Sequence, residues 1–221
     1  GAWIHIDAER ALAEARKRDA ATPGSPLHGI PFGIKDIIDT IDMPTGYGSP
    51  IYKDAQPLWD ASCVALLREA GCVALGKTVT TEFATRHAGK TCNPLDLTRT
   101  PGGSSSGSAA AVADFMVPVA YGTQTTGSVI RPGAYCGVVA VKPTFGLINR
   151  AGVKELSESM DTIGFYTRSV EDAALFLHVL ADYPQTDFGD VETLKPKIAI
   201  CRTTVWDQAN SETVALFDSL T

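Results

Sequence analysis

The stretch Thr100-Pro101-Gly102-Gly103-Ser104-Ser105-Ser106-Gly107-Ser108 runs directly into residues 109–113, an alanine-rich segment with the pattern of a helix. Glycine lets the main chain approach another group closely, and the N-terminus of a helix favours negative charge. The stretch therefore predicts a loop whose backbone N–H groups, at the start of a helix, bind an anion or the oxyanion of a reaction intermediate.

Three other interpretations of this stretch meet specific objections. The glycine spacing of Gly102 to Gly107 fits a phosphate-binding loop, but Ser108 stands where that motif has a lysine. Gly103 to Gly107 also fits a Gly-x-Ser-x-Gly elbow with Ser105 as the nucleophile, although that motif follows a strand and this one follows a proline. A flexible serine-glycine linker conflicts with the helix that begins at once.

A second segment, Gly122 to Pro132, follows the strand-like residues 117–121 and contains Ser128 directly after a glycine. A serine at the exit of a strand can stand clear of the sheet, while the N–H groups around it converge on one point. We predict an oxyanion hole here, with an ordinary turn as the alternative. The residues that would supply its N–H groups are Thr125, Thr126, Gly127 and Ser128.

A lone lysine, Lys35, interrupts the apolar, strand-like run Pro31 to Ile38. Neighbouring side chains on a strand point to opposite faces, so Lys35 can be buried while Asp36 faces the other way and does not neutralise it. A buried lysine costs stability unless it has a function. Lys35 is therefore a candidate functional residue, and the alternative is a lysine that protects a sheet edge from aggregation.

The rest of the chain alternates between helical and strand-like patterns, which predicts an α/β sheet covered by helices. Helical spacing of apolar residues predicts helices over residues 8–20, 61–70, 106–115, 170–181 and 211–220. Runs mostly bounded by Gly or Pro predict strands over residues 31–38, 72–76, 117–121, 138–141 and 197–201. Asp60 and Ser169 directly precede two of these helices, and we expect them to be N-caps.

Composition excludes several classes of protein. A chain of 221 residues, 44% of them hydrophobic, can bury a sizeable core. Its net charge of −6 and its scattered basic residues argue against direct binding of nucleic acid. No long apolar run or signal-peptide pattern is present, so we expect a cytoplasmic protein that does not contact a membrane. The histidines and cysteines lack metal-ligand spacing, which predicts no metal site and free, buried thiols.

Taken together and in this order, the three segments resemble the motifs of the amidase signature family over residues 27–177. The separation of 24 residues between Ser104 and Ser128 resembles that of the family, as do the flanks Glu82-Phe83-Ala84 and Lys142-Pro143-Thr144. The resemblance implies an α/β fold with a mixed β-sheet flanked by helices on both faces, incomplete on the C-terminal side.

We therefore interpret residues 1–221 as one partial domain. It has a leading helix over residues 1–26 and a catalytic core over residues 27–181. After the polar stretch 182–196, a strand and a helix over residues 197–221 would continue towards a missing C-terminal part.

By the same resemblance, Ser128 is the nucleophile that becomes acylated, Ser104 is a bridging serine after a cis peptide bond, and Lys35 is the base. Lys35 must be neutral to accept a proton, and burial lowers the pKa of a lysine. The implied reaction is hydrolysis of a linear carboxamide to an acid and ammonia or an amine. The reaction needs no cofactor, and its substrate is a small molecule. The resemblance also allows a homodimer. Asp161 also matches a family position, where we expect a structural hydrogen-bonding role.

Three residues depart from the commonest family pattern: Gln124 replaces Asp, Thr126 replaces Gly, and Arg131 lies three residues after Ser128 instead of two. These departures argue against one alternative that the resemblance allows, the A-subunit of a glutamyl-tRNA amidotransferase, which usually reads Asp-Thr-Gly-Gly-Ser-Ile-Arg here. A second alternative is a binding protein that keeps the fold without catalysis. Retention of all three predicted catalytic residues argues against it.

Overall fold

The computed structural model describes residues 1–181, 197 and 199–219. The chain divides into two compact units, Gly1–Thr186 and Asp187–Thr221, which we describe separately. The assignment of both to one partial domain stays a prediction. The polar stretch 182–196, which precedes the predicted strand and helix over residues 197–221, lies outside the described residues. No helix in the described ranges has the length and apolar character needed to cross a bilayer.

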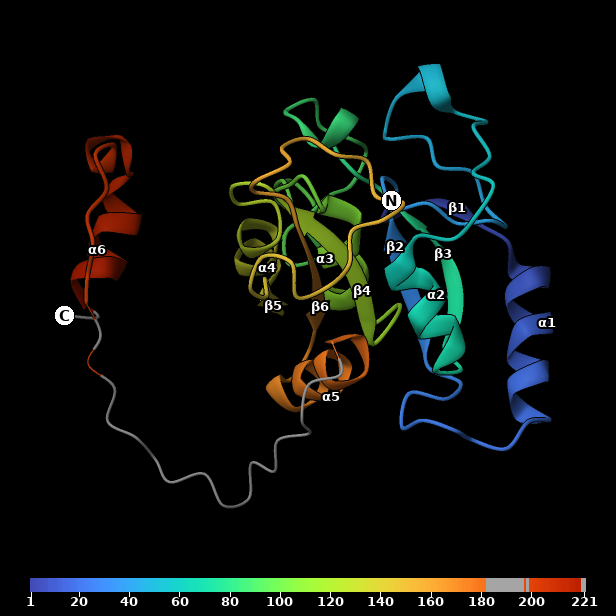
Figure 1. The fold of residues 1–221 in the computed structure, drawn as a ribbon. Helices are drawn as coiled ribbons and strands as arrows, with labels where there is room; N and C mark the ends of the chain where they lie inside the picture. Colours follow the sequence, from blue (N-terminus) through green and yellow to red (C-terminus); the bar gives the residue numbers. More distant parts are fainter. Residues whose placement is uncertain (182–196, 198, 220–221) are drawn as a thin grey trace. The chain divides into compact units, whose positions relative to one another are not determined.

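The first unit is built on one mixed sheet with the strand order β1-β3-β2-β4-β6-β5 (Figure 1). β2 runs parallel to β3 and β4, while β1 pairs antiparallel with β3, β6 with β4, and β5 with β6. The strands are β1 (Trp3–Ile6), β2 (Pro31–Lys35), β3 (Val73–Thr78), β4 (Val119–Gln124), β5 (Val139–Val141) and β6 (Thr162–Thr167). The central position of β2 places its C-terminal residue, Lys35, inside the fold.

Helices cover both faces of this sheet, and each face has its own hydrophobic core (Figure 1). The helices of the first unit are α1 (Ala8–Asp19), α2 (Ser62–Glu69), α3 (Ser106–Ala113), α4 (Ile130–Cys136) and α5 (Val170–Ala181), with 3-10 turns at Pro50–Tyr52 and Glu82–Ala84. α2 and α5 share one core with Phe32 and Phe165. α3 and α4 share the other core with Ala120 and Tyr166. The predicted α/β fold with helices on both faces is confirmed.

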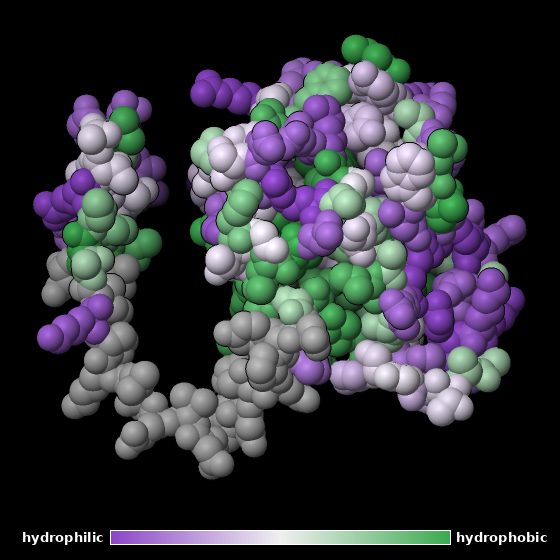
Figure 2. Space-filling view, viewed as in Figure 1, coloured by the Kyte–Doolittle hydropathy of each residue, from purple (hydrophilic) through white to green (hydrophobic). Residues whose placement is uncertain are grey.

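Within the first unit, α1 is the α-helix with the fewest buried residues. Its surface in Figure 2 is mostly hydrophilic, and Ala11 is its one buried residue. Arg10 fastens it to the sheet, because its Nη2 donates to the carbonyl of Ala74 on β3 at 2.6 Å and its Nη1 donates to Asp42 at 2.9 Å. Polar contacts therefore carry much of the attachment of α1, and the cores around the site do not depend on it.

The sequence patterns missed β1, β6 and α4. Every residue of β6 is buried, so this strand has no alternation of polar and apolar positions. Pro132 and Gly133 give α4 the composition of a turn, and its N-cap position is occupied by Val129, which makes no side-chain cap. These elements form because tertiary contacts outweigh their weak local signals.

One of the two expected N-caps is confirmed. Ser169 Oγ accepts a hydrogen bond from the N–H group of Asp172 at 3.0 Å, at the start of α5. The expectation for Asp60 is wrong, because Ala61 occupies the N-cap position of α2. The Asp60 carboxylate instead accepts from the N–H group of Ile41 at 2.9 Å, so a loop contact takes the place of the helix cap.

The second unit contains a 3-10 turn at Trp206–Gln208 and helix α6 (Ser211–Ser219), which confirms the predicted helix. The Trp206 ring packs on Phe217, with ring centroids 4.9 Å apart. Residues 197 and 199–201 do not form the predicted strand, because no other described segment pairs with them. Cys201 is exposed in this unit and Cys92 is exposed in the first, so the expectation of buried thiols is confirmed only for Cys63, Cys72 and Cys136.

Candidate active site

The fold brings the three predicted catalytic residues to one end of the sheet. Lys35 ends β2, Ser104 lies just before α3, and Ser128 lies between β4 and α4. The main chains of the two serine segments are in contact, because Ser105 N–H donates to the carbonyl of Ser128 at 3.3 Å. Parallel β2 and β4 end side by side, which is why residues so far apart in sequence meet here.

Lys35 is fully buried. Its Nζ lies 2.7 Å from Ser104 Oγ and 2.8 Å from Thr123 Oγ1. Burial holds the pKa of Lys35 well below the ordinary lysine value, because the charged ammonium loses its hydration, while the negative charge of Asp161 opposes this shift. A neutral amine can accept a proton, so the site meets the chemical requirement for a base.

Ser104 is held by contacts to its main chain. The peptide bond between Gly103 and Ser104 is cis, as the resemblance implies. Arg131 Nε and Nη2 donate to the carbonyl of Gly103 at 3.1 and 2.9 Å, and Thr81 N–H donates to the carbonyl of Ser104 at 3.1 Å. A Cβ atom added at Gly103 would lie 2.9 Å from Thr81 Cγ2, so a larger residue there would displace the Thr81 side chain.

Several polar groups in the loop that carries Ser128 make no described hydrogen bond. Among the described residues, no hydrogen bond uses the N–H groups of residues 125–128 or the hydroxyl of Ser128. Ser128 is 8% exposed, so it is nearly as buried as the rest of the cluster. Unused N–H groups beside a serine hydroxyl are the donors that an oxyanion needs. The structure joins Lys35 to Ser104 directly, and the described contacts include no Ser104–Ser128 hydroxyl bond.

Sequence reasoning missed one member of the site and underrated another. Thr123 lies on β4 beside Lys35, and its hydroxyl gave no signal in a run that already held three other threonine and serine residues. Asp161 accepts a hydrogen bond from Thr125 Oγ1 and from the N–H groups of Leu156 and Ser157. Its expected structural role is confirmed, and its charge also acts on Lys35.

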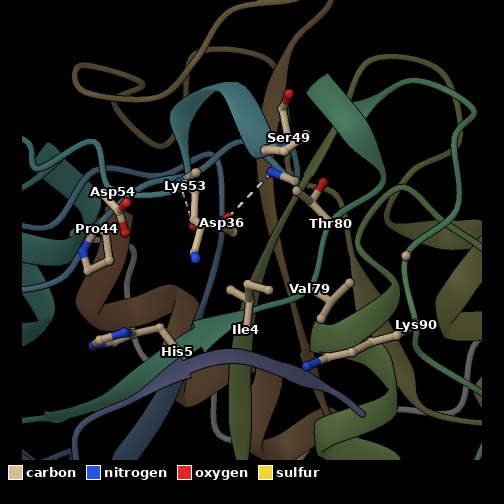
Figure 3. Close-up of a pocket in the computed structure, with 14 residues that line it drawn as sticks. Ile4, His5, Asp36, Pro44, Ser49, Lys53, Asp54, Val79, Thr80 and Lys90 are labelled. Atoms are coloured by element: carbon tan, nitrogen blue, oxygen red, sulfur yellow. Dashed lines mark hydrogen bonds between the residues drawn. The ribbon is translucent and has the colours of Figure 1, made fainter.

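A cavity of about 470 Å³ lies beside Asp36 and is lined by neither of the two serines predicted to be catalytic (Figure 3). Ile4 and His5 of β1 lie across it from Ser49 and Lys53, which belong to the segment after β2. Lys35 does not line this cavity either, although Asp36 is its neighbour in sequence.

Asp36 forms a buried ion pair with Lys77, with 3.5 Å between its Oδ1 and Lys77 Nζ. It also accepts from the N–H groups of Gly46 and Gly48. Burial lowers the pKa of Lys77 to about 8 and raises that of Asp36, and in each case the charge of the partner opposes the shift. The expectation that Asp36 faces away from Lys35 and leaves it unneutralised is confirmed.

We expect Lys77→Met to lower the free energy of unfolding by about 3–5 kcal/mol, because it leaves the Asp36 carboxylate buried without its cation. Urea unfolding at pH 7 measures this change. The double variant Asp36→Asn/Lys77→Met removes both charges and should recover part of the loss. A loss below about 1 kcal/mol in the single variant, as at a surface pair, would contradict this interpretation of the pair.

Known proteins resemble the chain over most of its length. A family model described as Amidase matches residues 1–217. The chain belongs to the amidase family. Two curated relatives named as the A-subunit of glutamyl-tRNA(Gln) amidotransferase are similar to it. That of Gloeothece citriformis is 42% identical and covers 89% of this chain and 44% of the relative. That of Solidesulfovibrio magneticus is 46% identical and covers 81% of this chain and 38% of the relative.

Solved amidase structures share the fold. The peptide amidase from Stenotrophomonas maltophilia is 41% identical, with a TM-score of 0.75 over 86% of this chain and 41% of that one. An amidase family protein from Bacillus anthracis is 36% identical, with a TM-score of 0.78 over 83% of this chain and 40% of that one. The chain thus spans less than half the length of each relative named here.

Proposed function

We propose that this chain carries the catalytic core of a serine amide hydrolase that cleaves the C–N bond of a linear carboxamide. The observation that supports it most is the 2.7 Å contact between Lys35 Nζ and Ser104 Oγ in a fully buried setting, next to the loop of Ser128. Membership of the amidase family agrees with amide chemistry. The chain spans less than half of each relative named above, so the proposal names a reaction and leaves the amide open.

In the proposed reaction, neutral Lys35 takes the proton of Ser104, and Ser104 takes the proton of Ser128 as Ser128 Oγ attacks the amide carbonyl. The N–H groups of residues 125–128 stabilise the negative charge on the tetrahedral oxygen, where one such donor contributes about 3–4 kcal/mol. The proton then returns through Ser104 to the leaving nitrogen, and the C–N bond breaks. Water hydrolyses the acyl-enzyme, which releases the acid and restores Ser128.

The proposal is tested by ammonia and amine release from a panel of amides, with the protein at its full length. The panel contains short linear carboxamides, C-terminal peptide amides and glutamine. We expect turnover of at least one amide and covalent labelling of Ser128 by a fluorophosphonate. A full-length protein that neither labels at Ser128 nor turns over any amide would contradict the proposal and favour a binding protein with this fold.

A second candidate function is the A-subunit of a glutamyl-tRNA amidotransferase. The identity of 42–46% to relatives with that name favours it, whereas Gln124, Thr126 and Arg131 favour the free-standing hydrolase. Purification of a tagged full-length protein from its own cells separates the two. Recovery with partner subunits, and glutaminase activity that depends on them, would favour the amidotransferase.

A further inference from the structure

Gln124, the last residue of β4, uses its side chain to hold the loop that carries Ser128. Its Oε1 accepts hydrogen bonds from the N–H groups of Val129 at 2.8 Å and Ile130 at 2.9 Å. Its Nε2 donates to the carbonyl of Thr126 at 3.2 Å. One buried side chain therefore contacts the main chain on both sides of Ser128.

These contacts supply what α4 lacks. The first N–H groups of a helix need acceptors from outside it, and Val129 at the N-cap position provides no side-chain bond. Gln124 Oε1 fills that role from the neighbouring strand. An amide combines an acceptor and a donor in one group, so it can bind two N–H groups and a carbonyl at once, which neither a carboxylate nor a hydrocarbon can do.

The other end of the loop is held separately, because Thr125 Oγ1 donates to the Asp161 carboxylate. The N–H groups of Val129 and Ile130 are bound to Gln124, whereas those of residues 125–128 donate no hydrogen bond within the described part of the chain.

We propose that Gln124 is a positioning residue, which holds the N–H groups of residues 125–128 in the direction that the developing oxyanion requires. It acts through the loop and touches neither the substrate nor the Lys35–Ser104 contact. This inference rests on the proposed hydrolase function.

The test compares Gln124→Leu and Gln124→Glu with the wild-type, full-length protein, by the rate constant for fluorophosphonate labelling of Ser128. Leu has a similar volume and no hydrogen bonds, and we expect it to slow labelling about 10²-fold, as the loss of one oxyanion donor does. Glu keeps an acceptor for Val129 and Ile130, so its rate should lie between those of Leu and the wild type. The final labelled fraction and the pH midpoint should not change, because Lys35 and Ser104 keep their contact.

Gln56→Leu is the matched control, since Gln56 also holds a loop, through Nε2 bonds to the carbonyls of Thr40, Ile41 and Met43. We expect it to label at the wild-type rate. The inference is overturned if Gln124→Leu labels at the wild-type rate, if Gln56→Leu slows labelling equally, or if the loss lies in the labelled fraction, which would indicate a fold defect alone.

Amide hydrogen exchange separates failure of this inference from failure of the hydrolase proposal. In the wild type the N–H groups of Val129 and Ile130 should be protected, and Gln124→Leu should remove that protection selectively. If the wild-type protein does not label but shows this exchange pattern, the loop contact stands and the hydrolase proposal falls. Protection that persists in Gln124→Leu overturns the inference whatever the labelling shows.

Discussion

Ser128→Ala is expected to abolish fluorophosphonate labelling and to lower amide hydrolysis by on the order of 10⁶-fold, the loss seen when a serine hydrolase loses its nucleophile. The physical reason is that the acyl-enzyme needs the Ser128 hydroxyl, which stands beside unused N–H groups and has no described partner that would occupy it. Ammonia release and mass spectrometry of the labelled protein measure the two effects.

Ser106→Ala is the matched control for this change. Ser106 is a buried serine near Ser104, and its hydroxyl donates to the carbonyl of Val79 at 3.3 Å, away from the proposed proton path. We expect it to label at Ser128 with nearly the wild-type rate. Labelling that persists in Ser128→Ala would show that another serine, such as Ser105 of the elbow interpretation, is the nucleophile.

Lys35→Met is expected to slow labelling by about 10²–10⁴-fold, the usual contribution of a general base. The wild-type rate should rise with pH through the lowered pKa of Lys35, because only the neutral amine accepts the proton of Ser104. The variant should lose that rise. A wild-type pH profile with its midpoint near the ordinary lysine value of about 10.4 would contradict the lowered pKa.

The same substitution has a second readout in stability. The lowered pKa means that the folded state holds fewer protons on Lys35 than the unfolded state between the folded and unfolded pKa values. The contribution of Lys35 to stability must therefore rise with pH in that window and fall as pH decreases. We therefore expect the difference in unfolding free energy between the wild type and Lys35→Met to change in favour of the wild type, by up to about 1.4 kcal/mol per pH unit just below pH 10. Lys77 is present in both proteins, so its titration cancels in the difference.

Secondary structure followed the sequence where local patterns are strong. The helices over residues 8–19 and 170–181 were predictable from apolar spacing, and so was the start of β2 at Pro31, although the predicted strand ran to residue 38 and β2 ends at Lys35. β6 and α4 were not predictable, because a strand buried on both faces has no alternation and α4 is capped by a side chain from β4. The prediction of a strand over residues 197–201 was wrong for the opposite reason. The local pattern is present, but no described segment pairs with residues 197 and 199–201.

The sequence by itself determined the residue types, their order and the separation of Ser104 from Ser128, and so the family. Only the tertiary structure decided three contacts. Lys35 hydrogen-bonds Ser104, 69 positions away in sequence, and also Thr123. Gln124 hydrogen-bonds the main chain of the loop that carries Ser128. Contacts of this kind depend on which strands become neighbours, and burial sets the pKa of Lys35 only once the sheet and α3 have closed around it. Strand order and burial arise from packing of the whole unit, which no local window of sequence contains.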